Sequence, residues 1–121
     1  NFSMNYFLFL SSCYTCKRIL EELILPKEVD LIDIKKDTLT EEQLAILHKA
    51  VGSYEALINK RAQLFKQRQI DTKKLTEENA KNLLLDHYTF LKRPVLVYRN
   101  KVFVGNSKAV VAEAKKWVDE H

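Results

Sequence analysis

The chain has 121 residues, of which 46% are hydrophobic and 30% charged, and its formal net charge is +4. This length and balance predict a single domain over residues 1–121 and exclude a disordered chain. The charge is compatible with an anionic ligand but does not indicate a dedicated nucleic-acid surface. No apolar run approaches the about 20 residues that span a membrane, and no secretory signal is recognisable. We therefore expect a cytoplasmic protein that contacts neither membranes nor nucleic acid directly, with a monomer as the default.

The first elements are predicted to be a strand, a helix and a second strand. Residues Asn5–Leu10 (NYFLFL) are almost uninterrupted in their apolar character, which is typical of a strand buried on both faces. From Tyr14 the spacing is helical until Pro26, and Val29–Ile34 (VDLIDI) then alternates as a strand does. The two strands of such a unit are expected to be parallel, with a right-handed crossover. The residues expected on the inner face of the helix are Cys16, Ile19, Leu20, Leu23 and Ile24.

The middle of the chain, roughly residues 40–90, is predicted to be an all-helical insert. Thr40 and Gln43 have the spacing of a capping box, so one helix is expected to begin there and to end at Gly52. A second helical segment is predicted over residues 53–65 and a third from Thr76. The inner stripes are expected to hold Leu44, Leu47 and Val51 on the first, Tyr54, Leu57, Ile58, Leu64 and Phe65 on the second, and Ala80, Leu83, Leu84 and Tyr88 on the third.

The end of the chain predicts a β-hairpin and a helix. Val95–Tyr98 and Lys101–Val104 flank Arg99-Asn100, which has the length of a two-residue hairpin turn. A last amphipathic helix presents Val110, Val111, Ala114, Trp117 and Val118. The order βαβ, helical insert, ββα is the thioredoxin-like arrangement, an α/β fold with a four-stranded mixed sheet.

Cys13 and Cys16 are the only cysteines, and they form a C-x-x-C motif where the first strand is expected to become a helix. A thiolate at a helix N-terminus meets unpaired backbone N–H groups and the positive end of the helix dipole, which lower its pKa. Lys17 and Arg18 add positive charge nearby. We therefore interpret Cys13 as a nucleophile and Cys16 as a thiol able to resolve a mixed disulfide on it.

Two other interpretations of the cysteines remain open. They could be ordinary structural thiols, one of them packed in the core. They could also bind zinc, but this would require two further ligands, and the three histidines show no ligand spacing among themselves. We expect no metal site.

Two arginines are candidate anion-binding groups. Arg61 is the single charged residue on the predicted inner stripe of the second helical segment, where a guanidinium is costly unless it is paired or faces a polar cavity. A break of that helix near Asn59-Lys60 would instead expose Arg61 to solvent. Arg93 precedes Pro94 just before a strand, a place that faces the active cysteine in thioredoxin-like folds. The proline there is typically cis, although an ordinary trans turn fits the sequence equally.

Three motifs together resemble the arsenate reductase (ArsC)/Spx family over nearly the whole chain, from about Asn5 to Val118. They are SSCYTCKRIL after the first strand, NKRAQLF in the insert, and FLKRPVLVYRNKVFVG before the final helix. The resemblance implies that Cys13 is the nucleophile and that Arg61 and Arg93 bind an oxyanion, which would be arsenate. It also implies that no cofactor is bound and that glutathione and glutaredoxin, or thioredoxin, supply the electrons.

Two features depart from the glutaredoxin-coupled reductases. Those enzymes usually carry a third arginine near the end of the last hairpin, where this chain reads Phe103–Asn106 (FVGN); Lys101 or Lys108 would have to substitute. They also generally lack the second cysteine, whereas Cys16 makes the chain similar to Spx, a redox-sensing regulator that binds the α subunit of RNA polymerase. We therefore expect a thiol-dependent oxidoreductase of the arsenate reductase family. An Spx-like regulator is the alternative, and a general disulfide reductase is a third interpretation, which would leave Arg61 without a role.

Overall fold

The computed structural model describes residues 4–121 and divides them into two compact units. The first, here called the sheet unit, comprises the described residues 4–37 and 93–121. The second, the helical unit, comprises Thr38–Lys92. The helical insert predicted over roughly 40–90 is therefore a compact unit of its own, and each unit is described separately below.

The sheet unit is built on four strands in the order β2-β1-β3-β4. β1 pairs in parallel with β2, whereas β1 with β3 and β3 with β4 are antiparallel, which confirms the predicted mixed sheet. The strands are β1 (Tyr6–Phe9), β2 (Asp30–Asp33), β3 (Val95–Tyr98) and β4 (Lys101–Val104).

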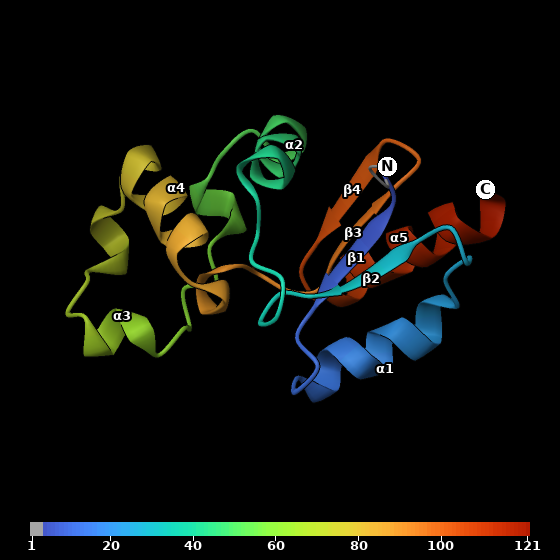
Figure 1. Cartoon of the computed structure of the whole chain (residues 1–121), viewed down its shortest axis with the longest axis horizontal. Helices are drawn as coiled ribbons and strands as arrows, with labels where there is room; N and C mark the ends of the chain where they lie inside the picture. Colours follow the sequence, from blue (N-terminus) through green and yellow to red (C-terminus); the bar gives the residue numbers. More distant parts are fainter. Residues whose placement is uncertain (1–3) are drawn as a thin grey trace. The chain divides into compact units, whose positions relative to one another are not determined.

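Helices α1 (Tyr14–Leu23) and α5 (Lys108–Glu120) cover the same face of this sheet (Figure 1). Their apolar stripes meet the side chains that β1, β3 and β4 direct to that face, and this removal of apolar surface from water is the main stabilising contribution in the unit. The buried members of this core are Phe7, Ile19, Leu23, Val29, Leu96, Tyr98, Phe103, Val111, Ala114 and Val118.

The hairpin between β3 and β4 has the predicted two-residue turn. Arg99 and Asn100 both have positive φ, 48° and 67°, as a turn that matches the twist of the strands requires. The side-chain oxygen of Asn5 accepts a hydrogen bond from the Arg99 backbone N–H at 2.9 Å and ties this turn to the start of β1.

One prediction for the first half of the sheet unit is wrong. Helix α1 ends at Leu23, and Ile24 adopts the left-handed conformation at φ 50° and is 75% exposed instead of facing the core. Leu31 in β2 is 54% exposed, because β2 is an edge strand whose alternating residues are not all covered.

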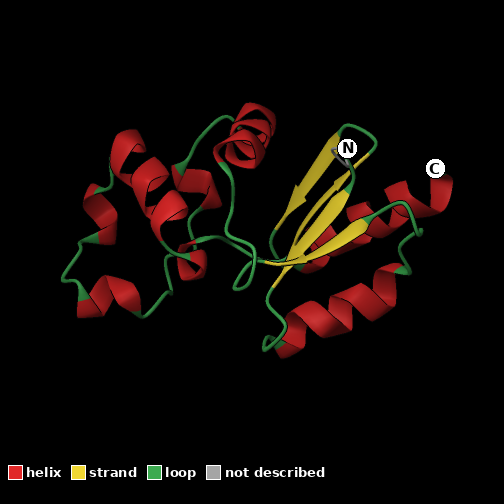
Figure 2. Cartoon of the chain, in the orientation of Figure 1, coloured by secondary structure: helices red, strands yellow, loops and turns green. Residues whose placement is uncertain are grey.

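The helical unit contains two regular helices among shorter helical segments and loops (Figure 2), and the starts of both and the end of the first follow the predicted positions. Helix α2 (Glu41–Val51) begins at a capping box between Thr40 and Gln43 and ends at Gly52, which has a φ of 88°. Helix α4 (Glu77–Asp86) begins after Thr76, whose hydroxyl accepts from the Asn79 N–H at 3.0 Å. The remaining elements are short: η1 (Glu55–Leu57), α3 (Leu64–Gln67), η2 (Thr72–Lys74) and η3 (Tyr88–Phe90).

The helix predicted over residues 53–65 is wrong. Ile58 pairs with Leu91 as an antiparallel bridge, and the Asn59 N–H donates to the Phe90 carbonyl at 2.7 Å. The backbone at residues 58–59 therefore pairs with a segment distant in sequence and does not continue a helix. Tyr88, expected on the third helix, lies beyond it in η3, and Val51 is 38% exposed rather than inside.

Within residues 4–121, none of the helices combines the length and the apolar character that crossing a membrane requires.

Candidate active site

Cys13 is the N-cap residue of α1 and follows directly on a closed turn at the end of β1. Its backbone N–H donates to the Leu10 carbonyl at 2.9 Å, and its carbonyl accepts from the Lys17 N–H at 3.2 Å. Its φ and ψ of −90° and 112° are extended, as an N-cap requires, and its sulfur accepts a hydrogen bond from the Cys16 N–H at 3.4 Å. The sulfur therefore takes the place that an oxygen holds in a Ser or Asp cap.

This position favours the thiolate of Cys13. Partial burial of the sulfur opposes ionisation, but it is outweighed by hydrogen bonds from the backbone N–H and thiol of Cys16, by the charge of Arg93 and by the Thr15 N–H. Together these interactions hold the pKa of the Cys13 thiol below its ordinary value. The side chain remains partly accessible, so an ionised sulfur can be reached by a substrate.

Cys16 has the opposite environment one turn further along α1. Its side chain is fully buried, and this burial, together with the hydrogen bond and negative charge of Cys13, raises the pKa of its thiol to about 11. The backbone of Leu10 and the charge of Arg93 oppose the rise and do not cancel it. Both cysteines are reduced in this structure, and Cys16 is a protonated donor to its neighbour near neutral pH.

Arg93 and Pro94 belong to the same unit as the cysteines and lead into β3. The peptide bond between them is cis, and the Pro94 carbonyl accepts from the Gly105 N–H at 2.9 Å. Arg93 is half-buried, and its charge acts on both cysteine thiols. Three of the predicted site residues, Cys13, Cys16 and Arg93, are thus brought together.

The two remaining cations lie on exposed positions. Lys17 is exposed on the first turn of α1, next to the cysteine pair in sequence. Arg61 is in the helical unit, where the Asn59 side chain accepts its backbone N–H at 3.2 Å in a turn of residues 59–61. The inner helical stripe predicted to carry Arg61 does not exist. Arg61 is instead exposed in a non-helical turn, as expected from the alternative in which the helix breaks near Asn59-Lys60.

The end of the last hairpin lies beside Pro94, as the Gly105 contact requires, and it carries no arginine there. Lys101 does not replace it, because Lys101 pairs with Tyr98 at the opposite, turn end of the hairpin. Its ammonium lies 4.9 Å from the centre of the Trp117 ring. Lys108, the other predicted substitute, is exposed at the start of α5.

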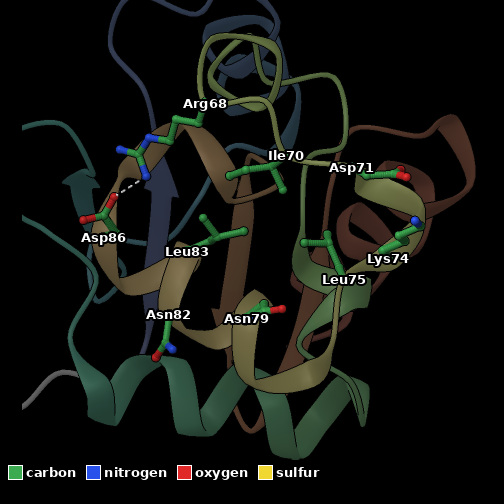
Figure 3. A pocket seen from close by; sticks show the side chains of 9 residues that line it. All are labelled: Arg68, Ile70, Asp71, Lys74, Leu75, Asn79, Asn82, Leu83 and Asp86. Atoms are coloured by element: carbon green, nitrogen blue, oxygen red, sulfur yellow. Dashed lines mark hydrogen bonds and ion pairs between the residues drawn. The ribbon is translucent and has the colours of Figure 1, made fainter.

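The helical unit has a hollow of about 670 Å³ formed by α4 and the segment between α3 and η2 (Figure 3). An ion pair between Arg68 and Asp86, 2.7 Å apart, closes one side, and Leu83 lies at its centre. None of the residues predicted for thiol chemistry lines this hollow. No group of three or more His, Cys, Asp or Glu side chains suited to a metal ion occurs among residues 4–121.

One contact of the Cys13 turn is absent from the sequence-based predictions. Hydrogen bonding with the hydroxyl and, to a lesser extent, the backbone N–H of Ser11 lowers the pKa of the Asp33 carboxyl at the end of β2. The available signal was an acidic residue at the end of a strand parallel to the one that leads into Cys13. Neither segment alone predicts the pairing register of β1 with β2 that brings Asp33 close to Ser11.

Comparisons with known proteins agree with this architecture. The model of the ArsC family matches residues 8–114. The crystal structure of a protein related to the ArsC family from Bacteroides fragilis is 26% identical, with a TM-score of 0.73 over 91% of this chain and 97% of that one. The solution structure of an arsenate reductase (ArsC) related protein from Brucella melitensis is 27% identical, with a TM-score of 0.66 over 87% of this chain and 88% of that one.

A possible arsenate reductase from Streptococcus mutans shares the fold at 23% identity, with a TM-score of 0.64 over 88% of this chain and 93% of that one. No curated protein matches the chain. These likenesses confirm the predicted thioredoxin-like fold with its helical insert. Because the family model covers well over half of the sequence, the chain belongs to the ArsC family.

Proposed function

We propose that this protein is a thiol-dependent oxidoreductase in which the Cys13 thiolate attacks an oxyanion, with arsenate as the first candidate, or a disulfide. The observation that carries the proposal is the place of a partly accessible Cys13 sulfur at the N-cap of α1, where it accepts the Cys16 N–H at 3.4 Å and where the charge of Arg93 helps to lower the pKa of its thiol. The names of similar proteins support arsenate as the substrate to test first.

The first step would form a bond between sulfur and arsenic. The thiolate of Cys13 attacks As(V), and one arsenate oxygen leaves as water after taking up protons. An anionic sulfur and an anionic substrate repel each other, so a cation must neutralise part of the charge during the attack. Arg93, whose charge already acts on the sulfur, is suited to this role because a guanidinium presents paired donors to an oxyanion.

The second step would reduce arsenic. A second thiolate attacks the Cys13 sulfur, an S–S bond forms as the S–As bond breaks, and the electron pair stays on arsenic, which leaves as arsenite. Cys16 and glutathione are both candidates for this thiol. The pKa of about 11 keeps Cys16 protonated at first, but two of its causes, the hydrogen bond and the charge of Cys13, disappear once Cys13 is bonded to arsenic.

Several further parts of the proposal rest on the resemblance. We propose that Arg61 contributes to oxyanion binding and that Lys17 and Pro94 support the site. No bound cofactor is needed, since glutathione with glutaredoxin, or thioredoxin, returns the disulfide to thiols. Such reductants belong to the cytosol, so we propose that the protein is cytoplasmic. We also propose that it is a monomer.

The test is arsenate reduction by the purified protein with glutathione and glutaredoxin, and separately with thioredoxin. The proposal predicts arsenite formation that is abolished in Cys13→Ser and reduced in Arg93→Ala. If Cys16→Ser loses turnover with thioredoxin but keeps it with glutathione and glutaredoxin, Cys16 is the resolving thiol when thioredoxin is the electron donor. Absence of arsenite with either donor, in a protein whose Cys13 alkylates readily, would rule out arsenate while leaving the thiol chemistry intact.

An Spx-like regulator is the second candidate, favoured by the buried Cys16 next to Cys13 and by the absence of an arginine beside Pro94 at the hairpin end. In that role a disulfide between Cys13 and Cys16 would alter affinity for the α subunit of RNA polymerase. Capture of that subunit by the oxidised but not the reduced protein, together with no arsenite formation, would favour the regulator. The Cys13→Ser and Cys16→Ser variants, which cannot form the disulfide, are the matched controls.

A further inference from the structure

Two parallel strands end side by side next to the proposed nucleophile. Phe9 and Asp33, the last residues of β1 and β2, are opposite each other in the pairing register. The Ile34 N–H donates to the Phe9 carbonyl at 2.9 Å, so the pairing continues to the very end of the strands. β2 therefore delivers the Asp33 side chain to the place where the chain leaves β1 toward Cys13.

The Asp33 carboxylate bridges from β2 to the turn that carries the cysteine. It accepts a hydrogen bond from the Lys35 N–H at 3.1 Å, and hydrogen bonding with the hydroxyl and the backbone N–H of Ser11 contributes to the lowered pKa of its carboxyl. Hydrogen bonding with the Ser11 hydroxyl is the largest influence on the Asp33 carboxyl. Together with the N–H groups of Lys35 and Ser11 and the charge of Lys36, it holds the pKa of this carboxyl below its ordinary value against the opposing effect of desolvation. The ionised carboxylate that these contacts favour is the form with enough acceptor sites for all of them.

The turn that receives these bonds has little else to fix it. Ser11 and Ser12 are its exposed central residues, and it is closed by the hydrogen bond from the Cys13 N–H to the Leu10 carbonyl. An exposed turn closed by one backbone bond is expected to open readily unless a side chain holds it. Cys13 lies at the end of this turn, so any movement of the turn displaces its sulfur from the N–H groups of α1.

We propose that Asp33 is a positioning residue for Cys13, acting through Ser11 to hold the 10–13 turn so that the sulfur stays at the N-cap of α1. This inference rests on the proposed function in so far as Cys13 is the attacking thiol. Asp33 touches neither sulfur nor substrate in this role. Its effect on the reaction is the fraction of time that the sulfur spends in the position where it is ionised.

The sign of a mutational effect separates this role from a purely electrostatic one. A carboxylate near a thiol disfavours the thiolate, so removing the Asp33 charge by itself would make Cys13 easier to ionise. Removing a clamp has the opposite result, because the sulfur loses contact with the N–H groups that stabilise its charge. The proposal therefore predicts that Asp33→Ala makes the thiol harder to ionise although a negative charge has been removed.

The experiment is the rate of Cys13 alkylation by iodoacetamide as a function of pH, followed by the mass of the modified peptide. In Asp33→Ala and Ser11→Ala the rate should rise with pH at a higher midpoint than in the wild type, and alkylation at pH 7 should be about two- to fivefold slower. Ser11→Thr keeps the hydroxyl and should titrate like the wild type. Urea unfolding of each variant shows whether it is folded.

Asp30→Ala is the matched control, because Asp30 is an exposed carboxylate on the same strand whose pairing partner is Tyr6. It should leave the midpoint unchanged. A midpoint in Asp33→Ala that falls or equals that of Asp30→Ala overturns the clamp, as does a Ser11→Ala variant that titrates like the wild type. A wild-type thiol of ordinary pKa would contradict the proposed function instead, while the difference between the wild type and Asp33→Ala still decides the clamp.

Discussion

The thiols of Cys13 and Cys16, one helical turn apart, have pKa values shifted in opposite directions. Cys13 is at the end of α1, where its sulfur accepts the Cys16 N–H at 3.4 Å, and the pKa of its thiol is lowered. Cys16 is inside the helix and fully buried, and the pKa of its thiol is raised to about 11. Burial is the largest cause of the raised pKa of Cys16, whereas Cys13 is stabilised as a thiolate by the unpaired N–H groups of the helix end, the Cys16 thiol and the charge of Arg93. This difference supports the proposal that Cys13 is the attacking thiolate and that Cys16 is a protonated donor to it.

Replacing Cys16 tests the part of this difference that its side chain contributes. In Cys16→Ala the backbone N–H remains but the thiol donor to Cys13 is lost, so the pKa of the Cys13 thiol should rise. Alkylation of Cys13 at pH 7 should be roughly two- to fivefold slower than in the wild type. Cys16→Ser retains a donor and should be less affected. An unchanged or faster rate in Cys16→Ala would show that the Cys16 thiol does not stabilise the thiolate.

Among the elements of the helical unit, the first residue of α4 holds the start of η1. The Glu77 carboxylate accepts from the Ser53 hydroxyl at 3.1 Å and from the N–H groups of Tyr54 and Glu55 at 2.9 and 3.0 Å. The pKa of this carboxyl is lowered, first by the Tyr54 N–H, then by the Glu55 N–H and, with slight desolvation opposing, by Ser53 and His48. This carboxylate thus caps a helix whose N-cap residue, Tyr54, makes no side-chain cap, alongside the Ser53 hydroxyl, which accepts from the Ala56 N–H at 3.2 Å.

Glu77→Gln should lower the urea midpoint of unfolding at pH 7. Because the folded state lowers the carboxyl pKa from 4.5, its stabilisation is complete above that value and is lost as the pH falls through the lower folded pKa. The difference in midpoint between the wild type and Glu77→Gln should therefore shrink with acidification. The neighbouring Glu78→Gln is the matched control. A pH-independent difference would mean that the carboxylate charge is not what holds η1.

The β3–β4 turn depends on a residue that tolerates positive φ. Asn100 has a φ of 67°, where a β-branched side chain is strained and asparagine or glycine is not. Asn100→Val should lower the free energy of unfolding by about 1–2 kcal/mol, whereas Asn100→Gly should leave it within about 1 kcal/mol of the wild type. Chemical unfolding of the two variants measures both values. Equal stability of the valine and glycine variants would contradict the turn geometry.

Across the whole chain, the sequence predicted correctly those features that depend on interactions between residues close in sequence. The two-residue turn at Arg99-Asn100 and the capping box at Thr40 depend on residues within a few positions of each other, and both are confirmed. The predicted helix over 53–65 is wrong because the backbone at Ile58 pairs with Leu91, a contact that no window of sequence contains. Propensity is a weak prior that such tertiary contacts override.

The same distinction between local features and long-range contacts applies to the candidate site. The C-x-x-C position could be predicted, since a strand-to-helix junction is a local feature, and so could the place of Arg93 before a proline. The contact of Asp33 with Ser11 could not, because it depends on the register of β1 with β2. The involvement of Arg61 stays a prediction drawn from the family resemblance.

Substitution of the two arginines tests their proposed roles in arsenate binding. Arg93→Ala should lower kcat/KM and also slow alkylation of Cys13, because its charge stabilises the thiolate. Arg61→Ala should raise KM for arsenate roughly ten- to a hundredfold, the cost of losing a charge-assisted contact. Lys60→Ala, which removes an equal charge from the adjacent position, should change KM little. Equal effects of Lys60→Ala and Arg61→Ala would reduce the role of Arg61 to general attraction of anions.

The account as a whole depends on a sulfur that is ionised near neutral pH, and the ultraviolet absorbance of its thiolate measures this directly. Titration of the wild-type protein, with Cys13→Ser as the blank, should show one thiol ionising below the ordinary range for cysteine and the other near 11. A titration in which the thiol lost in Cys13→Ser ionises at or above its ordinary value would contradict the assignment of Cys13 as the nucleophile.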